Sequence, residues 1–316
     1  MHFALPPRKT SHPPPYAPRQ SRPSVRIRRL QLLGLLSLAT LAVIYLLSRL
    51  FLFPSDRPPP GTPEVVIVTT LDSDLHPPEY LEKIKENRRA YAKLHGYATF
   101  FPSVTDYDLG GAPSSWARIP AVRHAMALYP HTTFFFQLDQ HALIMNPALT
   151  VTSHIMSRSR LEFLMLKDIP VVPPDSVIKT FSHLRGDRID LVLTQDGDGL
   201  SQDSFVLRQG DWAPFFLDAW FDPLYRQYNF QKAEVHALEH LVQWHSTVLA
   251  KLALVPQRIL NSYSQHGTQD DGKAELYKPG DFVMNMAGCD TNIKRNCATE
   301  LQQAWTAWIK ALESSS

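Results

Sequence analysis

The sequence predicts an α/β protein: a largely parallel sheet, covered by helices on both faces, that follows one membrane-spanning helix. Two observations lead to this class. Short apolar runs rich in β-branched residues alternate with segments whose apolar residues recur at helical spacing. The 316 residues are also 44% hydrophobic and 20% charged, which is enough apolar material to bury a core and excludes wholesale disorder.

An uncharged apolar segment, residues 30–48, comes first. At about 1.5 Å of helical rise per residue, it nearly crosses the ~30 Å hydrocarbon core of a membrane. Arg49 and Phe51 stand where a signal peptide would have small residues, which favours a retained anchor. Residues 1–29 contain seven Lys and Arg and no acid, so the amino terminus is expected in the cytosol. The predicted order is a basic, Pro-rich cytosolic tail (1–29), a transmembrane helix (30–53), a Pro-rich stalk (54–63) and a lumenal domain (64–316).

The lumenal part begins with a predicted strand at residues 65–71, an apolar run bounded by polar residues. A helix follows over 79–95, where apolar residues recur at helical spacing before Gly96. A second unit consists of a helix at 118–129 and a strand at 134–138. Further strands are predicted at 161–166, 189–194 and 204–208, and further helices at 232–252 and 301–312.

The charge distribution argues against nucleic-acid binding. Beyond residue 29, the chain has 25 Lys and Arg against 30 Asp and Glu. A surface that follows a phosphate backbone needs a broad excess of cations, and the predicted domain has none to spare.

The most informative segment is the strand at 134–138 and the residues after it, Asp139, Gln140 and His141. An acid at the end of an apolar strand lies at the carboxyl edge of the sheet, where α/β proteins bind their ligands. Alternation along the chain points Asp139 and His141 the same way. Nucleotide-sugar transferases place a divalent ion at this edge, whereas a turn-capping Asp beside a solvated His is the structural alternative.

Several stretches, in their order and spacing, are similar to glycosyltransferase family 34, the fungal Golgi α-mannosyl and α-galactosyl transferases, and most of all to the α-1,6-mannosyltransferase subunits of the mannan polymerase complex. They are VVIVTT (65–70), NRRAYAKLHGY (87–97), SWARIPAVRHAMALYP (115–130), QLDQHALIMN (137–146), SFVLR and DWAPFFLDAWFDP (within 204–223), ALEHLVQWH (237–245) and KPGDFVMNMAGC (278–289).

The resemblance implies a retaining transferase with a Rossmann-like GT-A fold, GDP-mannose as donor and a manganese ion on the diphosphate. It also implies a type II Golgi membrane protein with a lumenal catalytic domain, a glycan acceptor, an α-1,6 linkage and partner mannosyltransferase subunits. The residues expected to bind the nucleotide sugar are Thr69, Thr70, Arg118, Asp139, Gln140, His141 and Gly288.

Two positions depart from the family pattern. His141 stands where the family has the second Asp of Asp-x-Asp, and Asn285 stands where it has a metal-binding His. Asp139, His141 and Asn285 are therefore expected to form a weakened manganese site, since hard ions prefer anionic oxygen. Alternatively, a protonated His141 offsets the diphosphate charge, or the chain is a non-catalytic subunit that supports an active partner.

Acids that follow the later strands are candidate catalytic residues. Asp196 and Asp198 are placed to meet the donor sugar or the developing positive charge on it, and Glu239 is a further candidate with Glu234 on the acceptor side. The alternative for Asp196 and Asp198 is an ordinary turn, because Asp-Gly runs form turns.

Three features complete the prediction. His236, Glu239 and His240 fit the inverted zincin pattern His-x-x-Glu-His, which makes a zinc metallopeptidase a remote alternative. Cys289 and Cys297 are close enough in sequence for a disulfide in an oxidising compartment. Aromatic residues gather at Trp212, Trp220, Phe221, Tyr225, Tyr228 and Trp244, where they serve a core, stack on sugars or form a subunit interface.

Overall fold

The computed structural model describes residues 25–51, 58–173, 176–228, 230–265 and 275–315. It divides between Arg57 and Pro58 into two compact units. The first contains helix α1, Val25–Phe51, whose segment Ile27–Ser48 has a mean hydropathy of 2.2 and is long and apolar enough to cross a membrane. Most of the predicted cytosolic tail and the start of the stalk lie outside the described residues. Within the described part of the stalk, Thr62 N donates to Pro59 O and forms a turn.

The second unit is built on a six-stranded mixed sheet with the order β2-β1-β3-β6-β5-β7. Strands β1, β2, β3, β5 and β7 run parallel, and β6 runs antiparallel to its neighbours β3 and β5. The strands are β1 (Val65–Val68), β2 (Ala98–Phe100), β3 (Phe134–Leu138), β5 (Leu191–Asp196), β6 (Gly199–Arg208) and β7 (Leu252–Leu254). The predicted largely parallel sheet is confirmed, with β6 as its one reversed strand.

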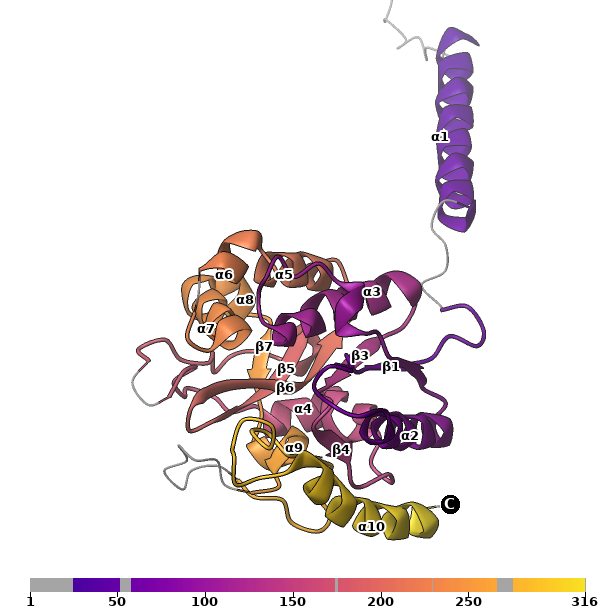
Figure 1. Ribbon diagram of the computed structural model, residues 1–316. Helices are drawn as coiled ribbons and strands as arrows, with labels where there is room; N and C mark the ends of the chain where they lie inside the picture. Colours follow the sequence, from indigo (N-terminus) through magenta and orange to yellow (C-terminus); the bar gives the residue numbers. More distant parts are fainter. Residues whose placement is uncertain (1–24, 52–57, 174–175, 229, 266–274, 316) are drawn as a thin grey trace, which may run out of the picture. The chain divides into compact units, whose positions relative to one another are not determined.

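Helices cover both faces of this sheet (Figure 1). Side chains alternate along β1: Val66 and Val68 pack with α3, α5 and α7, whereas Val65 and Ile67 pack with α2 and α4 on the other face. The helices are α2 (Pro78–His95), α3 (Arg118–Leu128), α4 (Arg158–Leu164), α5 (Trp212–Trp220), α6 (Pro223–Gln227), α7 (Ala233–Trp244), α8 (Ser246–Leu249), α9 (Gln257–Leu260) and α10 (Cys297–Ser315). Shorter helical turns lie at Val104–Asp106, Ser114–Ala117, Thr152–Met156 and Gly186–Arg188.

A second, three-stranded sheet has the order β4-β9-β8. Its strands are β4 (Ala142–Ile144), β9 (Val283–Asn285) and β8 (Ser262–Tyr263), and Ala142 pairs with Asn285. A buried cluster joins this sheet to α2 and α10, and the disulfide Cys289–Cys297 lies within it. The second sheet therefore brings the residues after β9 next to those after β3.

The structure corrects two predicted elements. Residues 161–166 are not a strand: Leu161 and Leu164 are buried at helical spacing in α4, while Phe163 is 79% exposed. The helix predicted over 232–252 ends at Trp244, because His245 takes an extended conformation, and the apolar run that follows forms α8 and β7. An apolar run alone does not distinguish a short buried helix from a buried strand.

Candidate active site

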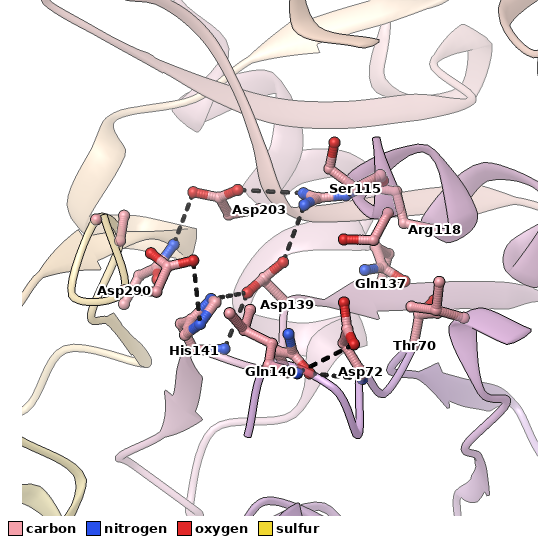
Figure 2. Close-up of a pocket in the computed structure, with 16 residues that line it drawn as sticks. Thr70, Asp72, Ser115, Arg118, Gln137, Asp139, Gln140, His141, Asp203 and Asp290 are labelled. Carbon is pink, nitrogen blue, oxygen red and sulfur yellow. Dashed lines mark hydrogen bonds and ion pairs between the residues drawn. The ribbon is translucent and has the colours of Figure 1, made fainter. Parts of the chain in front are cut away.

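The carboxyl ends of β1 and β3 open into a pocket of about 220 Å³ (Figure 2). Strand β6, strand β9 and the residues after β9 close its other side. The lining residues are Thr70, Asp72, Leu75, Val104, Ser114, Ser115, Arg118, Gln137, Asp139, Gln140, His141, Asp203, Asn285, Ala287, Gly288 and Asp290. The pocket lies at the sheet edge where α/β proteins bind ligands.

Arg118, at the start of α3, is the central cation of this pocket. Its Nη2 donates to Asp139 Oδ2 (3.0 Å) and its Nη1 to Asp203 Oδ1 (3.1 Å), while Nε lies 3.9 Å from Glu234 Oε1. Burial lowers the pKa of Arg118, but these three carboxylates raise it more, and the net shift is upward. The guanidinium is therefore a permanent, fixed charge whose geometry is set by β3, β6 and α7.

Asp139 joins Arg118 to His141. Its Oδ1 accepts from the backbone N (2.9 Å) of His141 and lies 2.7 Å from the ring Nδ1. Burial raises the pKa of Asp139, but the charges of His141 and Arg118 and the hydrogen bonds from His141 lower it well below its ordinary value. Burial and the charge of Asp139 raise the pKa of the neighbouring Asp203. Of these two acids, Asp139 is therefore the one whose ionised form the site favours more strongly.

The other nitrogen of His141 faces a second histidine. His141 Nε2 lies 2.8 Å from His76 Nε2 and 4.0 Å from Asp290 Oδ2. The His76 ring stacks on Tyr80, and burial followed by the charge of His141 lowers the pKa of His76 to about 4. His76 lies in the segment between β1 and α2, so residues from three parts of the chain meet at this point.

Some buried polar atoms at the pocket have no partner within the described structure. Asn285 uses both of its amide hydrogens, on Asp203 Oδ2 (2.9 Å) and Asn261 Oδ1 (3.0 Å), and its own Oδ1 is left unpaired. Thr70 Oγ1 and Gln137 Oε1 are also buried and unpaired. Because a buried polar atom without a partner costs about 1–3 kcal/mol, these atoms indicate a place for a polar ligand.

Most of the predicted nucleotide-sugar residues meet here: Thr70, Arg118, Asp139, Gln140, His141 and Gly288 all line the pocket, as does Asn285. Thr69 does not; it is fully buried behind the pocket, where Arg88 Nε donates to its Oγ1 (3.4 Å). Gln140 accepts from Asp72 N (2.9 Å) and so fixes the turn after β1.

Sequence comparisons identify the family of this chain. Residues 61–298 match the family described as the galactosyl transferase GMA12/MNN10 family. The chain belongs to this family. Among its similar members is the uncharacterized alpha-1,2-galactosyltransferase C8D2.17 of Schizosaccharomyces pombe, 30% identical over 240 residues that cover 73% of this chain and 72% of that protein. The probable alpha-1,6-mannosyltransferase MNN11 of Saccharomyces cerevisiae is 28% identical over 259 residues, covering 76% and 60%.

A solved structure supports the fold of this chain. A glycosyltransferase involved in the glycosylation of the major capsid of PBCV-1 superposes with a TM-score of 0.51 at 14% identity, covering 77% of this chain and all of that one. At this identity the similarity concerns the fold alone. The predicted α/β GT-A fold and the predicted family are confirmed, and membership of this family makes the chain a glycosyltransferase.

The predicted manganese trio does not form a ligand set as the structure stands. Both carboxylate oxygens of Asp139 already accept hydrogen bonds from Arg118 and His141. The other two predicted ligands offer one imidazole nitrogen of His141 and the amide oxygen of Asn285. Both atoms are neutral, whereas Mn²⁺ prefers anionic oxygen. A manganese ion at Asp139 would share Oδ2 with the Arg118 guanidinium and would gain only neutral ligand atoms from His141 and Asn285, so these residues would hold it weakly.

Sequence reasoning missed Asp72, His76, Asp203 and Asp290. Asp203 lies inside β6, one residue before the strand predicted at 204–208, and the reversed direction of β6 brings it to the same edge as Asp139. His76 and Asp290 lie in irregular segments. The short Cys289–Cys297 spacing was the available signal for Asp290, since a local disulfide fixes the residue next to it.

Asp196, Asp198 and Glu239 lie at the β5–β6 hairpin, away from the residues that line the pocket. Asp196 Oδ1 accepts from Asp198 N (2.8 Å) and Gly199 N (3.1 Å), and its Oδ2 accepts from the Tyr263 hydroxyl. Glu239 accepts from Leu200 N (3.0 Å), and burial raises its pKa. In the free chain the carboxylates of Asp196 and Glu239 stabilise this turn, and a catalytic role for Asp196, Asp198 and Glu239 stays a prediction.

Gly199 is required by this hairpin. Its φ is +142°, and an added Cβ would lie 1.9 Å from Glu239 Oε1. Gly199→Ala is therefore expected to destabilise the fold by about 2–3 kcal/mol through backbone strain and displacement of the buried Glu239 carboxylate. Thermal unfolding measures this change, with Gly210→Ala as the control because a Cβ there meets nothing within 4 Å. Equal melting temperatures for the two variants would show that the hairpin tolerates a side chain.

The zincin alternative is wrong. His236 Nδ1 accepts from Lys232 N (3.4 Å), Glu239 turns to the β5–β6 hairpin, and His240 packs between Tyr225 and Trp244. Within the described ranges, no group of three potential metal ligands forms on α7. Two histidines and an acid at helical spacing do not make a zinc site unless another part of the chain supplies a third ligand.

Proposed function

We propose that this chain transfers mannose from GDP-mannose to a glycan acceptor, with retention and an α-1,6 linkage, as one subunit of a Golgi complex. The observation that carries the proposal is the convergence of Arg118, Asp139, His141 and Asn285 on one pocket at the carboxyl edge of a GT-A sheet. Membership of the family implies a nucleotide sugar and a glycan acceptor. GDP-mannose as the donor, the α-1,6 linkage and membership in a complex go beyond what family membership implies and are proposed here.

The chemistry requires fixed positive charge beside the diphosphate. Breaking the bond between sugar and diphosphate leaves negative charge on the leaving group and an oxocarbenium-like sugar. Arg118 is preorganised to meet the leaving group, because three carboxylates hold its guanidinium at the pocket wall before any ligand arrives. The unpaired Thr70 Oγ1, Gln137 Oε1 and Asn285 Oδ1 supply hydrogen-bonding positions for donor hydroxyl and amide groups.

Membership in a complex is supported by exposed apolar side chains on α5, α6 and α7. Trp220 serves the core, but Tyr228 is 67% exposed and Trp244 is 74% exposed. Phe215 and Leu224 are similarly exposed on the same group of helices. Large exposed aromatic residues are characteristic of interfaces between proteins, so these residues also favour the second candidate, a non-catalytic subunit.

The first unit and the disulfide support the proposed localisation. Helix α1 has the length and composition of a membrane span, and seven cations precede its apolar segment. Cys289 and Cys297 are bonded, as expected on the oxidising side of a secretory membrane. These observations support the proposed type II orientation, with the second unit in the Golgi lumen.

The donor is tested by competition between nucleotides. The relatives bear the names of both mannosyl and galactosyl transferases, so GDP-mannose and UDP-galactose are the two donors to compare. Calorimetric titration of the full-length chain in detergent is expected to give at least about tenfold tighter binding of GDP-mannose, which corresponds to 1.4 kcal/mol. Tighter binding of UDP-galactose would assign the chain to galactose transfer.

A further inference from the structure

Arg295 carries a second buried guanidinium, which contacts the wall of the pocket. Its side chain is 5% exposed, and the side chain of its partner Glu300 is 7% exposed. The two groups form a bidentate pair, because Arg295 Nε donates to Glu300 Oε1 (2.8 Å) and Nη2 donates to Glu300 Oε2 (2.7 Å). Burial raises the pKa of Glu300, but the hydrogen bonds from Arg295 and Ser264 and the charge of Arg295 lower it more. Glu300 is therefore held as a carboxylate.

Further hydrogen bonds of Arg295 join two other parts of the chain. Nη1 donates to Ala287 O (2.6 Å), and Nη2 also donates to Ser264 Oγ (3.1 Å). Ser264 follows β8, and its hydroxyl donates in turn to Glu300 Oε2 (2.8 Å) in helix α10. Arg295 therefore ties Ala287, which follows β9, to the end of β8 and to the first turn of α10.

Ala287 belongs to a turn that lines the pocket. Cys289 N donates to Met286 O (3.0 Å) and closes the turn, and Gly288 has the positive φ, +74°, that the third position of a type II turn requires. The C=O and N–H of one trans peptide point in opposite directions. Because Ala287 O points to Arg295, the N–H of Gly288 points away from it, and both Ala287 and Gly288 line the pocket. Among the described residues, none accepts a hydrogen bond from this N–H.

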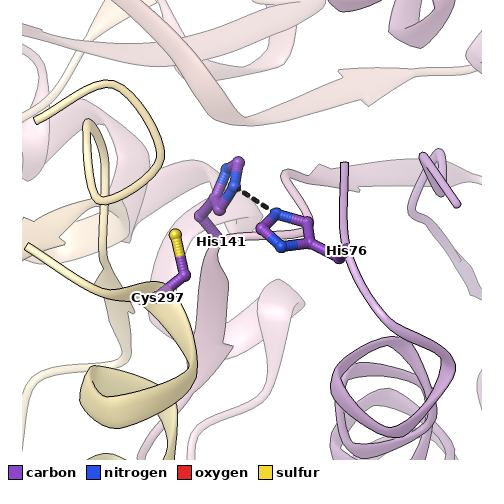
Figure 3. A group of neighbouring side chains, drawn as sticks. All are labelled: His76, His141 and Cys297. Carbon is purple, nitrogen blue, oxygen red and sulfur yellow. Dashed lines mark hydrogen bonds between the residues drawn. The ribbon is translucent and has the colours of Figure 1, made fainter. Parts of the chain in front are cut away.

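A disulfide fixes the loop that carries Arg295. The bond between Cys289 and Cys297 spans this loop, and Cys297 begins α10. The Cys297 sulfur lies within 4.8 Å of a ring nitrogen of His76 and of one of His141 (Figure 3). The loop is therefore packed against the histidine that lines the pocket, and Arg295 reaches the turn from a fixed base.

Stability alone does not account for the pair of Arg295 and Glu300. Desolvation of two buried charges offsets most of their attraction, so a buried ion pair contributes little net stability. A guanidinium differs from an apolar side chain in direction, because its planar fork fixes the groups that it binds. Here the fork joins Glu300 to the carbonyl of Ala287, which lies outside the helices and strands.

We propose that Arg295 is a positioning residue, which fixes the peptide between Ala287 and Gly288 so that its N–H faces a ligand in the pocket. A backbone N–H in a turn binds anionic oxygen, so the ligand class that fits is a nucleoside diphosphate. Arg295 is not one of the described residues that line the pocket, so it acts through this peptide. The identity of the ligand rests on the proposed function, whereas the hold on the turn rests on the contacts of Arg295.

The test measures ligand binding by the full-length chain in detergent, below its melting temperature. The probes are GDP or UDP, whichever the unaltered chain binds more tightly, and the matching nucleoside, whose weak binding is followed by saturation-transfer NMR. Arg295→Met is expected to weaken binding of the diphosphate at least about 10-fold, the size of a lost hydrogen bond to a charged group, and to leave the nucleoside affinity unchanged. General damage to the fold would weaken both ligands.

Arg295→Lys separates position from stability. Lysine keeps a charge beside Glu300 but has no planar fork, so this variant is expected to melt near the unaltered chain and to bind the diphosphate as weakly as Arg295→Met does. The control is Lys294→Met, since Lys294 is exposed in the same loop.

Should Arg295→Met fail to fold, Arg295→Lys carries the test. Normal diphosphate affinity in Arg295→Lys, or equal weakening of diphosphate and nucleoside in either variant, would overturn this inference alone. An unaltered chain that binds neither GDP nor UDP would overturn the proposed function with it.

Discussion

Replacing Arg118 with methionine is expected to abolish sugar transfer and to destabilise the fold. The guanidinium contacts Asp139 and Asp203 and lies 3.9 Å from Glu234, and its side chain is 10% exposed. Methionine fills a similar volume but leaves three carboxylates at the pocket without their shared cation. Removal of one partner from a buried charge network costs about 3–5 kcal/mol. Loss of a preorganised charge at the leaving group lowers turnover by about 10²–10³-fold.

Thermal unfolding and transfer from GDP-mannose measure the two effects separately. Arg123→Met is the control, because Arg123 lies on the same helix and its ion pair with Asp218 is solvent-exposed. The control is expected to change stability by less than about 1 kcal/mol. If Arg118→Met has the same melting temperature and turnover as the control, Arg118 is not a central residue of the site.

Replacing Asp139 with asparagine is expected to reduce transfer by about 10²–10⁴-fold with a small loss of stability. The amide keeps the size of the carboxylate but not the charge that holds Arg118 and His141 in place. Arg118 retains Asp203 and Glu234, so the fold keeps most of its network. The loss of turnover has the size seen when a group that orients a catalytic residue is removed.

Steady-state kinetics with GDP-mannose, together with thermal unfolding, separate this outcome from general damage. Asp218→Asn serves as the matched control, since Asp218 pairs with Arg123 at the surface. Near-normal turnover in Asp139→Asn would place the donor elsewhere. A fall in turnover matched by a collapse in melting temperature would make Asp139 a structural residue only.

Much of the fold could be predicted because its signals are local. Strand β3 begins and ends at the predicted residues, and helix α2 ends where Gly96 takes a left-handed conformation with φ of 67°. The direction of β6 was missed, because a strand itself carries no mark of whether it runs parallel or antiparallel. The Asp-Gly turn at 196–199 joins β5 and β6 into a hairpin, which was the signal for the reversal.

The site was predictable where it follows one strand and not where it depends on distant segments. Asp139 and His141 came from the end of β3, and Asn285 from the family pattern. His76 joins them through the turn between β1 and α2, and Asp290 through a disulfide-bonded loop, so only the folded chain reveals the pair of imidazoles. The zincin prediction failed for the same reason. The spacing of residues on one helix does not show that the Glu239 carboxylate accepts a hydrogen bond from Leu200 N on a distant strand.

The most direct test of the account is transfer by the full-length chain in detergent from GDP-mannose to an α-mannoside acceptor, with the new linkage identified by NMR. The account predicts an α-linked mannose product that the unaltered chain forms and the Asp139→Asn variant does not. No product from the unaltered chain, with GDP-mannose or UDP-galactose, alone or together with the subunits that copurify with it, would contradict it.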